Sequence, residues 1–159
     1  MTIQAPPSER RLVLRLLDYW RRVTAERRWP RPGDFYPAAL PDLWRFCFLI
    51  DLTGTDRGGE RTFSYIGDFH RDMYDMDLIG TALAKADPNI LLSRATSYID
   101  EVLERQVPVT YGGRFVDRRG YGVLYRSILL PLSNDNDTIT AILGAANCQE
   151  TAPDLAQSA

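Results

Sequence analysis

The residues best suited to metal or acid–base chemistry lie together in the segment DFHRDMYDMD, residues 68–77. If this segment is helical, Asp68, Asp72 and Asp75 share one face, and the chain's single histidine, His70, is nearby. Such carboxylates can hold a divalent cation, but their spacing does not fit the EF-hand loop, and the glycine of that loop is missing. Sites built on paired histidines are excluded. We therefore predict no metal site and a surface or hydrogen-bonded His70.

Motifs for phosphate binding and nucleophilic catalysis are absent from the sequence. Phosphate loops need glycines at fixed spacing beside a helix start, whereas Gly112-Gly113 and Gly120-x-Gly122 fall in or beside predicted strands. There is no Gly-x-Ser-x-Gly turn, and a serine or cysteine nucleophile has few possible bases. We predict no catalytic residues.

The two cysteines, Cys47 and Cys148, are too few and too far apart for a disulfide framework or a cysteine zinc site. They fall on the first and last predicted strands and can form a redox pair. In a reducing cytoplasm we favour buried thiols that pack as small apolar residues.

The composition is that of one globular domain. Of 159 residues, 45% are hydrophobic, 25% charged and 11% aromatic. No stretch is apolar enough for a membrane span or a signal peptide, so we predict a cytoplasmic protein without membrane association. The net charge is −2, but residues 1–31 carry eight arginines against three acidic residues. This segment can contact nucleic acid, a membrane surface or an acidic partner, although we favour a solvated helix face.

The predicted elements begin with an amphipathic helix over residues 8–28, and a linker extends to residue 36. Residues 37–150 form the main domain, and we predict a disordered tail over 151–159. Within the domain we expect strands at 46–52, 62–67, 109–117, 121–133 and 138–148. A helix over 89–106 precedes the last three strands, with Asp87 as its N-cap and Pro88 at its first position.

All strand connections except one helical crossover are hairpins, which predicts an α+β fold with a five-stranded antiparallel sheet. Residues 128–132 and 139–146 are apolar at odd and even positions alike, so both sheet faces should be buried. The central helices cover one face. The N-terminal amphipathic helix is the natural cover for the other.

Several segments in a defined order resemble a short, stand-alone bacterial PAS-domain family. They are Leu14–Arg21 with Pro30 and Asp34, Leu40–Trp44, Phe63–Gly67, Leu78–Gly80, Tyr125–Ser133 and Ile142–Gly144. The resemblance implies a PAS-like fold and a role in sensing or regulation, and it identifies no chemistry. Some PAS domains bind haem, usually through a histidine on the long helix, here residues 89–106, which has none. The cofactor is therefore left open.

In the PAS fold, the space between sheet and helices holds a ligand when side chains do not fill it. Candidates to line it combine apolar bulk with polar tips; they are Tyr65, Phe69, His70, Met73, Tyr74, Leu91, Tyr98 and Arg126. Arg126 either points inward to an acid or an anionic ligand, or lies in water at a sheet edge. The alternative for the whole space is a packed core.

We predict a non-catalytic sensory or regulatory PAS protein that signals through small-molecule binding, or through protein–protein interaction and dimerisation. No output domain follows, so the output is expected to be binding. The homodimer would form through the N-terminal helix; its apolar stripe is Val13, Leu16, Leu17, Trp20 and Val23. The alternative is a ligand-free adaptor whose basic helix or outer sheet face binds a signalling partner or nucleic acid.

Overall fold

The computed structural model describes residues 7–152 of the chain. The helices are α1 (Pro7–Thr24), α2 (Asp68–Met73), α3 (Leu91–Ala95) and α4 (Ile99–Arg105). The strands are β1 (Cys47–Asp51), β2 (Thr62–Ile66), β3 (Val109–Val116), β4 (Gly122–Leu132) and β5 (Ala141–Thr151). Short 3-10 turns lie at Pro32–Asp34, Pro37–Ala39, Trp44–Phe46, Thr55–Arg57 and Leu83–Lys85.

The five strands form one antiparallel sheet with the order β2-β1-β5-β4-β3. This confirms the predicted sheet. The last strand begins later than predicted and continues through Thr151, the first residue of the predicted tail. Residues 153–159 of that tail lie outside the described residues.

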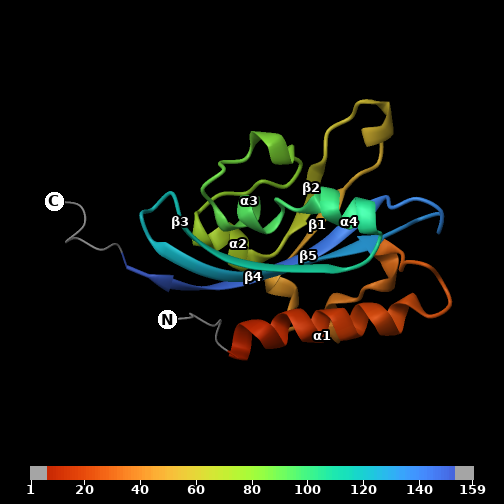
Figure 1. Cartoon of the computed structure of the whole chain (residues 1–159), viewed down its shortest axis with the longest axis horizontal. Coiled ribbons are helices and arrows are strands. Elements are labelled where there is room, and N and C mark those ends of the chain that lie inside the picture. The colour runs from red at the N-terminus through yellow and green to blue at the C-terminus, as the bar shows by residue number, and fades with distance from the viewer. Residues whose placement is uncertain (1–6, 153–159) are drawn as a thin grey trace.

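Both faces of the sheet are covered, as predicted. Figure 1 shows α1 along one face, here called the outer face, and α2, α3 and α4 on the other, here called the inner face. The inner core includes Phe48, Phe63, Leu91, Tyr98, Val102 and Leu129. The outer core includes Leu16, Trp20, Trp29, Ile128, Leu130 and Leu143. Because β4 and β5 separate the two cores, nearly every side chain in their central parts is buried.

Helix α1 packs on the outer face through one apolar stripe. Leu12, Val13, Leu16 and Trp20 are buried at helical spacing, while Arg11, Arg15 and Arg21 are exposed. Burial of each large apolar side chain contributes about 2 kcal/mol. The Trp20 indole also donates a hydrogen bond to the carbonyl oxygen of Pro131 in β4, with an Nε1–O distance of 3.0 Å. The helix ends before Ala25, which has a left-handed φ of 51°.

The predicted long helix over residues 89–106 is wrong in two respects. The chain forms two short helices, α3 and α4, separated by a turn at residues 96–98. In that turn the Thr96 hydroxyl bonds to the Leu92 carbonyl at 2.8 Å and the Ser97 hydroxyl to the Arg94 carbonyl at 2.8 Å. Such hydroxyls compete with helical backbone bonds. Asp87 is no helix cap, because its carboxylate instead accepts from the Asn89 N–H and helix α3 begins at Leu91.

The inner core depends on one glycine. Gly144 of β5 lies opposite Phe48 of β1. A Cβ atom at position 144 would overlap the Phe48 ring. Glycine is therefore required here because the aromatic ring lies across the β5 backbone.

Candidate functional site

The space between the sheet and helices α2–α4 is filled with side chains. Leu91, Tyr98 and His70, three of the predicted ligand-binding residues, are themselves buried there. Phe69, Met73 and Tyr74 are partly buried and pack against the same core. These six residues share the inner face, and their side chains occupy the space that a ligand would need.

Two predicted ligand-binding residues lie elsewhere. Tyr65 stacks on Trp44 with ring centroids 5.2 Å apart and packs against the outer core. Arg126 has the strand parity of Ile128 and Leu130, whose side chains belong to the outer core. Successive side chains of a strand point to opposite faces of the sheet. Arg126 therefore lies on the outer face and does not face Tyr98 or Leu91. The eight residues therefore do not form a single site.

His70 is held as a neutral, buried imidazole. Its Nε2–H donates to the carbonyl oxygen of Phe46 at 2.8 Å, and its Nδ1 has no hydrogen-bond partner among the described residues. The rings of Phe48 and Phe69 pack edge-on against it at 5.6 and 5.2 Å. Burial lowers the pKa of His70 to about 4, and the Phe46 bond offsets this only in part. The predicted hydrogen bond is present, and the ring is buried rather than on the surface.

A polar network that sequence reasoning missed joins α2, α3 and the β3–β4 turn. Asp117 is 4% exposed, accepts from the Tyr74 hydroxyl at 3.0 Å, and pairs with Arg119 at 2.6 Å. Burial alone would raise the pKa of Asp117, but the hydrogen bonds from Arg119 and Tyr74 lower it. The Leu91 N–H in turn donates to the Tyr74 hydroxyl. The network fixes the start of α3 against the sheet.

The acidic segment does not converge on a cation site. Helix α2 ends at Met73, and Asp75 follows it with a φ of 50°, so Asp75 does not continue the helical face of Asp68 and Asp72. Arg71 lies 3.5 Å from Asp68 and 3.7 Å from Asp77. Within residues 7–152, no three histidine, cysteine, aspartate or glutamate side chains gather closely enough to hold a metal ion.

The two cysteines lie on opposite faces of the sheet. Cys47 belongs to the outer core and is paired in register with Ala145, whereas Cys148 packs against the inner core. No disulfide joins them. Burial raises the pKa of the Cys47 thiol to about 12, so it is not a reactive thiolate. The redox-pair alternative is thereby set aside.

The residues predicted for dimerisation pack largely against the chain's own outer core. Val13, Leu16 and Trp20 are buried against the outer face, and Leu17 and Val23 are partly buried there. Among the residues of α1 whose burial the structure describes, Leu14 is the large apolar residue that is exposed, at 60%.

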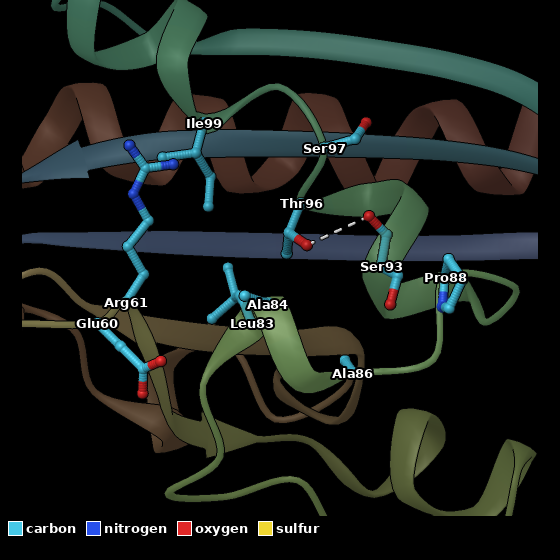
Figure 2. A pocket seen from close by; sticks show the side chains of 10 residues that line it. All are labelled: Glu60, Arg61, Leu83, Ala84, Ala86, Pro88, Ser93, Thr96, Ser97 and Ile99. Carbon is cyan, nitrogen blue, oxygen red and sulfur yellow. Dashed lines mark hydrogen bonds between the residues drawn. The ribbon is translucent and has the colours of Figure 1, made fainter.

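An open groove of about 480 Å³ lies beside the filled core. It separates residues 83–88 from helices α3 and α4, with Arg61 at one end and Pro88 at the other (Figure 2). Its apolar lining is Leu83, Ala84, Ala86, Pro88 and Ile99, and its polar lining is Glu60, Arg61, Ser93, Thr96 and Ser97. The lining therefore combines apolar surface with a few polar groups.

Most polar groups of the groove form hydrogen bonds or an ion pair within the chain. The Thr96 and Ser93 hydroxyls bond to backbone carbonyls, and Arg61 pairs with Asp100 at 2.5 Å. Sequence reasoning did not find the groove, because its residues come from three separate segments and no local motif marks them.

Comparisons with known proteins identify the family of the chain. A family model described as a PAS domain matches residues 8–147. The chain is similar to the LOV domain of a blue-light activated histidine kinase from Erythrobacter litoralis, with 11% identity, TM-score 0.47, and coverage of 66% of this chain and 95% of that chain. It is also similar to the PAS domain of a protein from Colwellia psychrerythraea, with 16% identity, TM-score 0.48, and coverage of 70% and 95%. No curated protein matches the sequence. Within residues 7–152, no helix is long and apolar enough to cross a membrane.

Proposed function

The chain belongs to the PAS-domain family, and we propose that it is a non-catalytic sensory or regulatory protein that binds a small amphipathic molecule in the groove. One observation carries this proposal: the interior is packed with side chains, while the groove between residues 83–88 and helices α3 and α4 is open. The ligand would lay its apolar part on Leu83 and Ile99 and direct its polar end toward Glu60 and Arg61.

A path of direct contacts connects the groove to α1. Tyr98 follows the groove residues Thr96 and Ser97, and its hydroxyl lies 2.7 Å from the Ser127 hydroxyl of β4. On the opposite face of β4, Ile128 packs in the outer core beneath α1. A ligand that binds two arrangements of α3 and α4 with different affinity shifts the balance between them. We therefore propose that groove binding changes the packing of α1 on the sheet.

We further propose that the protein acts as a homodimer and that Leu14 lies at its interface. The other large apolar residues of α1 are buried or partly buried in the chain's own outer core, whereas Leu14 is exposed. Replacing Leu14 by arginine should lower the mass measured by light scattering from that of a dimer to that of a monomer. Unchanged mass would remove Leu14 from the interface.

The groove is tested by mapping fragment binding with amide NMR spectra. A library of small soluble fragments should include molecules that shift the signals of Ser93, Thr96 and Ser97. The Ala84→Trp variant fills the groove and should abolish these shifts. Ala39→Trp is the matched control, since Ala39 is an exposed alanine that does not line the groove. Shifts that survive in Ala84→Trp, or that cluster on core residues such as Leu91, would contradict groove binding.

The adaptor alternative receives less support from the geometry. Arg22 lies 3.3 Å from Asp18, Arg27 donates to the carbonyls of Trp29 and Ser133, and Arg28 bonds to Gln106. These three arginines are thus engaged within the chain, whereas Arg11, Arg21 and Arg31 are exposed and remain available to a partner. Salt-sensitive binding to a nucleic acid or protein that is lost in Arg21→Gln would favour the adaptor.

A further inference from the structure

The two edges of the sheet are finished differently. The edge at β2 is covered by the chain itself, because the Phe63 N–H donates to the Thr81 carbonyl at 3.1 Å and the Phe63 carbonyl accepts from the Gly80 N–H at 2.6 Å. The other edge strand, β3, pairs with β4 over eight consecutive residues without a bulge. No group that the structure describes forms a backbone hydrogen bond with the side of β3 that faces away from β4, here called the open edge.

Every second residue of β3 directs its backbone groups to the open edge. At the β3–β4 turn the Asp117 N–H donates to the Tyr121 carbonyl at 2.9 Å, which marks a hydrogen-bonded pair. Hydrogen-bonded and non-hydrogen-bonded pairs alternate along an antiparallel ladder. The residues whose N–H and C=O groups point away from β4 are therefore Thr110, Gly112, Arg114 and Val116, and all four are exposed. Such a row of free donors and acceptors can bind an extended strand.

Arginines without an acidic partner flank the open edge on both faces of the sheet. On the outer face, a Cβ atom at Gly112 would lie 3.3 Å from Cδ of Arg126, so the Arg126 side chain reaches from β4 across Gly112. The exposed Arg114 lies on the same face of β3. On the inner face, the guanidinium of Arg94 lies over the Phe115 ring, 4.9 Å from its centroid. None of the three arginines forms an ion pair with a side chain that the structure describes.

This charge decides which strand the open edge can accept. If β3 of a second copy paired with β3 across a two-fold axis, the arginines of both copies would lie along one joint, and like charges placed opposite each other are unfavourable. An acidic strand has the complementary charge. A carboxylate opposite Gly112 would meet Arg126, because glycine has no side chain to stand between them.

We propose that the open edge of β3 docks an acidic, extended segment of a partner protein, which adds to the sheet as an antiparallel strand. Its acidic side chains lie on the outer face beside Arg114 and Arg126. The residues between them pack on the half-exposed ring of Tyr111, which stacks on Tyr98 with centroids 4.9 Å apart. The inference does not rest on the proposed groove function, because β3 contributes no residue to the groove.

The probe is a short peptide, blocked at both ends, that alternates threonine and glutamate and is titrated into the full chain. Amide NMR should show saturable shifts at Thr110, Gly112 and Arg114. The same peptide with glutamine in place of glutamate should bind about tenfold more weakly, because it keeps the backbone hydrogen bonds but loses the ion pairs. No saturable binding, equal affinities, or shifts confined to groove residues Ser93 and Thr96 would overturn the inference.

Methylation of the peptide nitrogens tests the strand pairing itself. Directly paired residues of antiparallel strands share a face, so the glutamates on the outer face are also the residues that hydrogen-bond to the open edge. Methylating the glutamate nitrogens should therefore abolish binding, whereas methylating the threonine nitrogens should largely preserve it. Equal binding of the two methylated peptides would contradict strand addition.

Variants of the chain assign the contacts. Thr110→Pro removes one donor of the open edge, a change that edge strands tolerate, and should weaken binding; Thr110→Ala keeps the donor and is its matched control. Arg126→Gln should weaken the glutamate peptide about tenfold and leave the glutamine peptide unchanged, whereas the exposed Arg21→Gln on α1 should change neither. Wild-type binding by Thr110→Pro would remove the open edge as the site. Shifts of the β3 amides with protein concentration, in the absence of peptide, would assign the edge to a second copy and overturn the inference.

Discussion

Lowering the pH from 7 to 5 should destabilise the folded chain through His70. The side chain is 3% exposed, and burial lowers its pKa from the ordinary 6.5 to about 4. Below pH 6.5 the unfolded chain binds a proton at His70, whereas the folded chain binds it only near pH 4. The contribution of His70 to the unfolding free energy is therefore present above pH 6.5 and is lost as the pH falls toward 4. This pKa difference corresponds to about 3 kcal/mol at full protonation, of which about 2 kcal/mol is expected by pH 5.

The assay is urea unfolding at pH 7, 6 and 5, followed by the fluorescence of the chain's three tryptophans. His70 is the chain's only histidine, and the carboxyl groups of Asp42, Asp117 and Asp135 have lowered pKa values, so they titrate below this range. His70→Gln has no titrating ring and should show a nearly constant unfolding free energy from pH 7 to 5. Equal pH dependence in wild type and His70→Gln would refute the reasoning.

Three further changes test the packing. Deleting residues 1–30 uncovers the outer sheet face and should cause aggregation; a soluble monomer with the wild-type melting temperature would contradict this. Gly144→Ala should lower the unfolding free energy by about 2 kcal/mol, because its Cβ overlaps Phe48, whereas Gly33→Ala, with open space around it, should change it little in urea denaturation. Asp117→Ala leaves Tyr74 without its acceptor and should lose about 2 kcal/mol in the same assay; wild-type stability would show that the buried network contributes nothing.

The sheet and its two covers could be predicted from the sequence because their signals are local and strong. Residues 128–132 and 139–146 are apolar at every position, which requires cover on both faces. The predicted apolar stripe from Val13 to Val23 packs on the outer face and covers it. Arg126 was predicted to line the inner space, but it shares the strand face of Ile128 in the outer core, because parity alone does not say which face α1 covers and which face α2–α4 cover.

The site was harder to predict because it depends on contacts between distant segments. The turn at Thr96 and Ser97 divides a predicted helix, and their hydroxyl bonds cannot be read from spacing. The groove exists only because residues 83–88 fold beside that turn. Likewise, Asp117 sits in an ordinary turn sequence, and its burial follows from the positions of Tyr74 and Arg119.

Native mass spectrometry of the full chain purified from its own host tests most directly whether the groove binds a ligand. The account predicts a dimer that carries one discrete small-molecule mass per chain. The same mass should be missing from Ala84→Trp and present in Ala39→Trp, each purified in the same way. A dimer without added mass, or an added mass that Ala84→Trp retains, would contradict the claim that this PAS domain senses through the groove.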